Sequence, residues 1–149
     1  ARVPGLPEAF DGLRIVQLSD LHVGPHTSAR FLRRATDAAR ALRPDVVAIT
    51  GDLVDDRPED VAAFARVTAA LDAPLGVFLI PGNHDVYAGW DAVEAALGVH
   101  TDAHVLVNDV HLLRRGGAAL ALLGTGDPAG AGGPSTPPRA HGQRRAGPD

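Results

Sequence analysis

Apolar and polar positions along the first 123 residues predict short strands separated by helices. Three apolar runs without alternation, at 13–18, 45–50 and 75–80, have the character of strands that are covered on both faces. The segments between these runs are long enough to hold helices that return the chain to the same end of a sheet. The pattern therefore predicts an α/β fold with a parallel-sheet βαβαβα core.

The first predicted helix begins at Thr27 or Ser28 and ends before Pro44, because the residue before a proline avoids the helical conformation. Apolar side chains recur along it with the helical period. The positions expected to be buried are Phe31, Leu32, Ala35, Ala38, Ala39 and Leu42. The arginines between them are expected to form a solvated face, and these are Arg33, Arg34 and Arg40.

Two further helices are predicted. The first of these opens at Pro58 and ends at Pro74, with proline in its first turn. Its buried stripe is expected to consist of Val61, Phe64, Ala65, Thr68 and Leu71. The other is expected over 90–97, with Gly98 as its C-terminal cap.

The sequence after residue 104 changes character twice. Apolar runs at 105–107 and 110–113, followed by Gly116-Gly117 and the apolar run 118–123, predict a β-hairpin. Of the 26 residues from 124 to 149, twelve are glycine or proline, and a segment of this composition is expected to be disordered. We therefore expect a lead-in at 1–12, a folded unit at 13–123 and a disordered tail at 124–149.

Composition excludes several classes of function. The net charge of the 149-residue chain is −4, which argues against a nucleic-acid-binding surface. With no cysteine, the chain has no disulfide, thiolate metal site or cysteine nucleophile. No apolar run approaches the roughly 18 residues of a membrane span, so the chain as given is expected to be soluble. Membrane attachment would require sequence not shown, and the cellular compartment is left open.

A cluster of polar residues follows each of the three predicted strands, at 19–22, 51–55 and 82–85. The clusters recur at about the length of one βαβ unit, so crossover connections would bring all three to the carboxyl edge of one sheet. Their carboxylate, imidazole and amide groups are ligands that suit Mn, Fe(II) or Zn. Asp20 and His22 are two residues apart, and from an extended loop both can point into one site.

As a set, Asp20-x-His22, Gly51-Asp52-x-x-Asp55 and Gly82-Asn83-His84-Asp85 resemble the motifs of the calcineurin-like metallophosphoesterase superfamily. The surrounding sequence is similar to the bacterial branch of this superfamily, whose members are often membrane-anchored. The resemblance covers about residues 13–123. It implies that the chain forms the N-terminal half of an α/β/β/α sandwich.

The resemblance also implies a cofactor of two divalent metal ions, which would be Mn, Fe or Zn. Asp20 and His22 match ligands of the first metal, and Asp52 matches the carboxylate that bridges both metals. Asn83 matches a ligand of the second metal.

Two further residues match catalytic positions of the family. His84 matches the histidine that contacts the phosphate and protonates the leaving oxygen. Asp55 matches the acid that orients this histidine. Asp85 occupies an acidic motif position that does not bind metal. The implied activity is hydrolysis of phosphate mono- or diesters through a metal-bridging hydroxide, on a small molecule or a lipid head group.

One family motif, Gly-His-x-His, does not occur in this chain. By the family pattern the second metal therefore keeps only Asp52 and Asn83, and most of the second sheet would be absent. The tail is expected not to be native family sequence. Two alternatives to a phosphoesterase follow. One is a truncated metal-binding remnant without turnover, and the other is a plain nucleotide-binding α/β module, which explains the fold but not the three clusters together.

Overall fold

The computed structural model describes residues 3–127 and 139–140. Four parallel strands form the main sheet in the order β1 (Ile15–Leu18), β2 (Val46–Thr50), β3 (Val77–Ile80) and β4 (His104–Val105). Each strand pairs with the next one along the chain, because a helical crossover separates every pair. The predicted α/β class is therefore confirmed.

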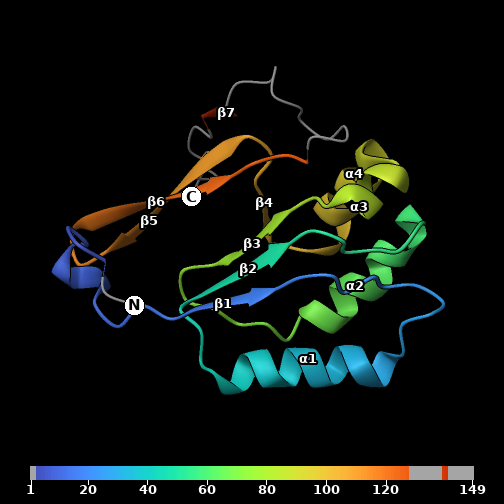
Figure 1. Ribbon diagram of the computed structural model, residues 1–149, viewed down its shortest axis with the longest axis horizontal. Coiled ribbons are helices and arrows are strands. Elements are labelled where there is room, and N and C mark those ends of the chain that lie inside the picture. Colours follow the sequence, from blue (N-terminus) through green and yellow to red (C-terminus); the bar gives the residue numbers. More distant parts are fainter. Residues whose placement is uncertain (1–2, 128–138, 141–149) are drawn as a thin grey trace, which may run out of the picture.

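Helices cover one face of this sheet (Figure 1). They are α1 (Ala29–Ala41), α2 (Val61–Thr68), which follows the 3-10 turn η2 (Pro58–Asp60), and α4 (Trp90–His100). Alternate residues of the strands, such as Val47 and Ile49, pack against buried side chains of these helices in one core. This is the larger of two hydrophobic clusters among the described residues.

The opposite face of the sheet is covered by a hairpin. Its strands are β5 (Asp109–Arg115) and β6 (Ala118–Gly124), joined at Gly116-Gly117 as the sequence predicts. Val46 and Phe78 point to this side and pack with Leu113 and with Phe10 of the 3-10 turn η1 (Glu8–Phe10). The result is three layers: helices, the parallel sheet, and a second sheet in the order β6-β5-β7.

The cap of α1 is as predicted, but its buried stripe is not. The side chain of Ser28 accepts a hydrogen bond from the Phe31 backbone N–H, which fixes the start of the helix. The buried residues are Leu32, Thr36 and Ala39, whereas Phe31 and Leu42 are 54% and 59% exposed. The prediction passed over Thr36 because threonine is polar. Its hydroxyl donates to the Arg33 carbonyl at 2.9 Å and is thereby satisfied inside the helix.

All five residues of the stripe predicted for the second helix are buried, as expected. The helix itself is shorter than predicted, because α2 ends at Thr68 and Leu71 lies beyond it. Two predictions further along are wrong. Gly98 lies inside α4 rather than at its cap, which is Thr101. A short helix, α3 (Asn83–Tyr87), forms where the sequence indicated only a loop.

The predicted disordered tail, 124–149, lies mostly outside the described residues. Gly124 is the last residue of β6, and β7 (Arg139–Ala140) pairs in parallel with the start of β5. Among the helices of the described ranges, none is both long and apolar enough to cross a lipid bilayer.

Candidate metal centre

The loops that follow β1 and β2 run side by side beyond the ends of the strands. The His22 N–H donates to the Asp52 carbonyl at 2.9 Å, and the Val23 N–H donates to the Leu53 carbonyl at 3.0 Å. Val23 and Val54 also form an isolated parallel bridge. This pairing carries the register of the sheet into the loops and places His22 next to Asp52.

Left-handed backbone conformations, rather than an extended loop, aim the side chains into the site. Asp20, His22 and Asp52 have φ angles of 56°, 41° and 52°. Only two other non-glycine residues of the described chain, Arg43 and Asn108, share this conformation. Each such residue costs on the order of 1 kcal/mol, and strain of this kind concentrates at functional sites. Three strained residues in one cluster therefore mark this edge of the sheet as a candidate site.

Glycines allow the loops after β2 and β3 to touch. Gly51 has a φ of 93°, and a Cβ on it would lie 2.7 Å from the Gly82 Cα. A Cβ on Gly82 would collide with the Asp52 carboxylate and lie 2.5 Å from the Asp52 nitrogen. Any side chain at position 82 would therefore displace Asp52.

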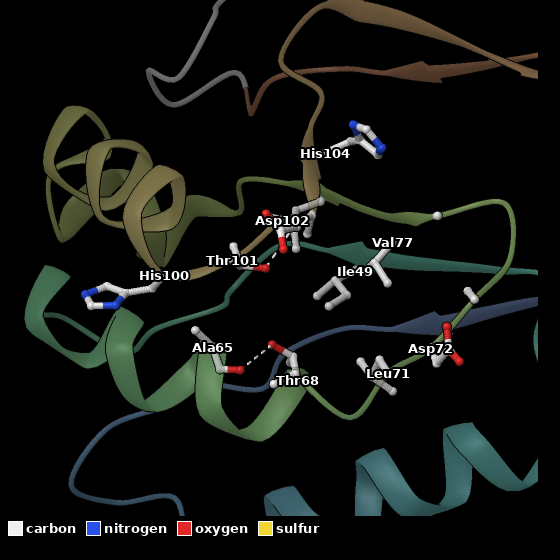
Figure 2. A pocket seen from close by; sticks show the side chains of 15 residues that line it. Ile49, Ala65, Thr68, Leu71, Asp72, Val77, His100, Thr101, Asp102 and His104 are labelled. Carbon is white, nitrogen blue, oxygen red and sulfur yellow. Dashed lines mark hydrogen bonds between the residues drawn. The ribbon is translucent and has the colours of Figure 1, made fainter. Parts of the chain in front are cut away.

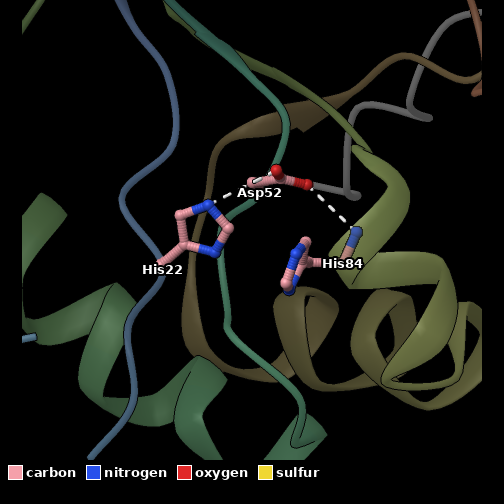
Figure 3. A group of neighbouring side chains, drawn as sticks. All are labelled: His22, Asp52 and His84. Atoms are coloured by element: carbon pink, nitrogen blue, oxygen red, sulfur yellow. Dashed lines mark hydrogen bonds and ion pairs between the residues drawn. The ribbon is translucent and has the colours of Figure 1, made fainter. Parts of the chain in front are cut away.

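Three side chains converge at this edge, two from the loops after β1 and β2 and one from α3 (Figure 3). His22, Asp52 and His84 each offer a ligand atom within 4.8 Å of the other two. His22 Nε2 lies 3.4 Å from Asp52 Oδ2, and the two imidazole rings meet edge to face with centroids 4.5 Å apart. Two imidazoles and a carboxylate at this spacing form a group that can hold a divalent cation of the Mn, Fe or Zn type.

The position of His84 is fixed from two sides. Its backbone N–H donates to Asp52 Oδ1 at 3.0 Å, and its ring Nδ1 lies 2.8 Å from the Asp55 carbonyl oxygen. A carbonyl only accepts hydrogen bonds, so Nδ1 carries the proton in this contact and Nε2 is the ring nitrogen that remains for other interactions. The Asp55 carboxylate is farther away, at 3.6 Å from Nδ1. Asp55 thus contacts His84 chiefly through its main chain.

Asp20 and Asn83 lie at the margins of this group. The Asp20 side chain is 67% exposed, and its Oδ1 is 3.9 Å from His22 Nε2. Asn83 is the first residue of α3, half-buried and directly before His84. The metal-ligand roles of Asp20, His22, Asp52 and Asn83, and the catalytic roles of His84 and Asp55, remain predictions.

Asp85 has a structural role that the sequence did not reveal. It is fully buried, and its carboxylate accepts hydrogen bonds from the backbone N–H groups of Gly82, Leu53 and Val54 at 2.9 to 3.0 Å. Burial raises the pKa of Asp85 above its usual value, against the opposing effect of these hydrogen bonds. The residue ties the loop after β3 to the loop after β2. An acid directly after His84 was visible in the sequence, but its burial was not.

Tyr87 is a second residue whose place was not anticipated. It stands one turn after His84 on α3, is 70% exposed, and its ring centroid lies 6.0 Å from that of His84. Its ring therefore borders the open side of the site.

The candidate centre is separate from a cavity of about 370 Å³ elsewhere in the molecule (Figure 2). That cavity lies between the end of α2 and the segment that joins α4 to β4, with Thr68, Thr101 and Asp102 among its lining residues. No residue of the candidate metal centre lines it. The chemistry of the ligand groups, and not the size of a cavity, therefore identifies the site.

Comparison with known proteins agrees with this geometry. Residues 13–133 match the family model of the calcineurin-like phosphoesterases. The chain belongs to this family. The matched segment contains all three strand-end clusters, the parallel sheet and the hairpin of β5 and β6.

Individual relatives have the same family character. A "Transmembrane protein with metallophosphoesterase domain" from Danio rerio is 37% identical over 65% of this chain and 23% of its own length. An uncharacterized metallophosphoesterase of Campylobacter jejuni is 32% identical over 84% of this chain and 32% of its own. UDP-2,3-diacylglucosamine pyrophosphatase LpxG of Chlamydia trachomatis is 38% identical over 70% of this chain and 30% of its own. The chain thus spans about a quarter to a third of the length of these relatives.

Among solved structures, TT1561 of Thermus thermophilus has a similar fold. The TM-score is 0.55 at 19% sequence identity, over 77% of this chain and 49% of that one. At this identity the likeness concerns the fold alone.

Proposed function

We propose that this chain contributes the strand-end loops of a phosphoesterase site that hydrolyses phosphate mono- or diesters with the help of two divalent cations. The observation that carries the proposal is the convergence of His22, Asp52 and His84 from two loops and the helix α3, with ligand atoms within 4.8 Å of one another. Membership of the calcineurin-like phosphoesterase family supports it.

The residues present fit a cation. His22 Nε2 lies close to carboxylate oxygens of both Asp20 and Asp52, which supplies negative charge and an imidazole donor at one point. We assign the first cation to Asp20, His22 and Asp52. The second falls to Asp52 and Asn83. Mn, Fe and Zn are the metals that suit these donors.

Divalent cations bound here would make water a stronger nucleophile near neutral pH and would offset charge on the phosphate oxygens. The chain's own contribution to proton transfer rests with His84. Its Nδ1 proton is held by the Asp55 carbonyl, so a proton for the leaving oxygen would come from Nε2. The ring must then carry protons on both nitrogens, the second taken up from solvent, and it returns to the neutral form after the transfer. Tyr87 stands beside that ring and would contact the leaving group.

The substrate is proposed to be a phosphate ester of a small molecule or of a lipid head group. The Chlamydia trachomatis relative, which is named a pyrophosphatase for UDP-2,3-diacylglucosamine, supports the lipid class.

A second candidate function is cation binding without turnover. It is favoured by one observation: only Asp52 and Asn83 are assigned to the second cation, which is few ligands for a firmly held ion. In that case the chain retains one cation at His22 and Asp52, and phosphate esters remain intact.

One experiment separates the two functions. The purified chain is loaded with Mn²⁺, its metal content is measured, and hydrolysis of bis-p-nitrophenyl phosphate is followed. Two ions per chain with hydrolysis support the phosphoesterase, whereas one ion without hydrolysis supports the second candidate. Asp52→Asn should abolish both metal retention and turnover, while Asp91→Asn, at an exposed position of α4, serves as the matched control. Hydrolysis that survives in Asp52→Asn would refute the proposed role of Asp52.

A further inference from the structure

The solvent side of α1 carries large apolar side chains where the sequence predicted buried ones. Phe31 and Leu42 are 54% and 59% exposed, and Ala38 between them is exposed as well. Steps of seven and eleven residues return to nearly the same side of an α-helix, so these three positions form a row along the axis. From Phe31 to Leu42 the row spans about 16 Å at 1.5 Å per residue. The core of the protein uses a different stripe of the same helix.

Arginines stand beside this apolar row. The helix contains four arginines against one aspartate, in a chain whose net charge is −4. Asp37 pairs with Arg40 at 3.8 Å, whereas Arg30, Arg33 and Arg34 form no ion pair within the described part of the chain. Arg30 and Arg34 are one turn apart, and both are exposed along the same side of the apolar row. The positive charge is therefore concentrated on one surface.

The placement of these arginines near the start of α1 destabilises the helix. Three of them lie in the first two turns of α1, and its first turn holds no acidic residue. The N-terminus of a helix carries partial positive charge, so cations there are unfavourable by some tenths of a kcal/mol each. Neither the core nor the helix itself gains from this arrangement. An external anionic partner would gain from it.

We propose that this side of α1, formed by Arg30, Phe31, Arg34, Ala38 and Leu42, docks the protein on an anionic lipid surface. Phe31 and Leu42 enter the boundary between head groups and acyl chains, and Arg30 and Arg34 contact lipid phosphates. The helix lies parallel to the membrane plane, since its apolar row and its arginines both run along its axis. This inference does not depend on the proposed catalytic function.

A lipid surface fits these features better than other polyanions or a second copy of the chain. A nucleic acid would engage the arginines but would leave the row from Phe31 to Leu42 in water. A second copy docked on the same face would bring its arginines against those of the first, which is unfavourable. A partner that is anionic at its surface and apolar beneath satisfies both sets of side chains, which neither of these two alternatives does.

The position of α1 determines which side of the molecule would face the membrane. α1 lies on the outer side of the helical layer, with its first turn toward the carboxyl edge of the sheet (Figure 1). His22 precedes that turn by seven residues. A membrane held along α1 would therefore lie on the same side of the molecule as the loop that carries Asp20 and His22.

Vesicle flotation of the full chain tests the proposal. Vesicles of phosphatidylglycerol mixed with phosphatidylcholine are compared with vesicles of phosphatidylcholine alone, at low and at physiological salt. We expect binding to the anionic vesicles only, weakening as salt rises. Each basic residue near such a surface contributes about fivefold to partitioning, so Arg30→Gln with Arg34→Gln should reduce binding roughly 25-fold.

The apolar pair is tested with Phe31→Ser and Leu42→Ser, which should reduce vesicle binding by about tenfold or more. Val99, 79% exposed on α4, provides the matched control, and Val99→Ser should bind as the wild type does. All positions are exposed, so thermal unfolding should show the variants to be folded. Equal binding to neutral and anionic vesicles, or binding that neither pair of substitutions reduces, would overturn the proposal. Binding to duplex DNA that is as strong as vesicle binding and is unchanged by Phe31→Ser would also overturn it. The same holds if the chain forms a dimer instead of binding vesicles, and the dimer dissociates in the Ser variants.

Discussion

Gly82 lies so close to Asp52 that a Cβ at position 82 would collide with the Asp52 carboxylate. The loop after β3 thus sets the place of a side chain on the loop after β2. The two loops are in direct contact, and the absence of a side chain at Gly82 leaves the space that the proposed bridging ligand, Asp52, occupies.

Gly82→Ala should therefore remove cation binding although residue 82 offers no ligand. The new methyl group displaces Asp52, and the resulting overpacking should lower the free energy of unfolding by about 1–3 kcal/mol. Gly98→Ala is the control, because a Cβ there meets no atom within 4 Å. It lies inside α4, where alanine is favoured by about 0.5–1 kcal/mol. Metal titration and urea unfolding of both variants give the measurement, and undiminished metal binding by Gly82→Ala would contradict the proposed placement of Asp52.

Divalent cations should stabilise the folded chain through His22 and Asp52. A ligand at 100 times its dissociation constant adds about 2.7 kcal/mol to the free energy of unfolding. We expect Mn²⁺ to raise the Tm of the wild type and EDTA to reverse the change. Asp52→Asn should show little response, while Asp91→Asn should respond as the wild type does. An equal Tm increase in Asp52→Asn would place the cation elsewhere.

His84 should affect turnover more than metal content. If its Nε2 donates the proton to the leaving oxygen, His84→Ala should lower kcat by about 10²–10⁴ while the chain retains its metal. The loss should be largest for substrates with poor leaving groups, since these depend most on protonation. Metal analysis beside steady-state kinetics provides the test. If His84→Ala releases a cation, His84 is a ligand instead, as its place in the three-residue group also permits.

Asp85 should be essential for folding rather than for chemistry. Asp85→Ala leaves the backbone N–H groups of Gly82, Leu53 and Val54 without their acceptor in a buried setting. We expect a loss of roughly 3–5 kcal/mol in the free energy of unfolding, measured by chemical denaturation. Asp72→Asn, at an exposed position, should change it by less than about 0.5 kcal/mol. A small effect of Asp85→Ala would mean that water replaces the carboxylate at little cost.

The hydrophobic pattern was sufficient for the first three strands of the main sheet and for the edge that holds the candidate site, but not for β4, whose apolar run was assigned to a hairpin. Continuous apolar runs predicted β1, β2 and β3, and the polar clusters after them predicted the edge where Asp52 and His84 meet. Periodicity was less reliable on α1, where Phe31 and Leu32 are neighbours and only one of them can face the core. Burial of Thr36 depends on a hydrogen bond within the helix, which a polarity pattern does not indicate.

The remaining features depend on contacts between distant segments. α3 begins at Asn83, where Asp85 accepts the Gly82 N–H and closes the first turn. The left-handed backbone of Asp52 follows from pairing between two loops, for which the local sequence offers no signal. The same is true of Asp55, whose carbonyl, rather than its carboxylate, is the nearer partner of His84.

The positive φ angles of Asp20, His22 and Asp52 restrict which amino acids these positions can accept, before any coordination chemistry is considered. Valine, isoleucine and threonine are excluded by their branched Cβ, whereas glycine, asparagine and aspartate are tolerated. Two independent constraints thus limit the amino acids at these three positions. One is the steric requirement of the backbone, and the other is the chemistry of cation binding. A library randomised at the three positions should reveal them separately: selection for folding alone would enrich glycine, asparagine, aspartate and histidine, and selection for cation binding would narrow these to aspartate and histidine.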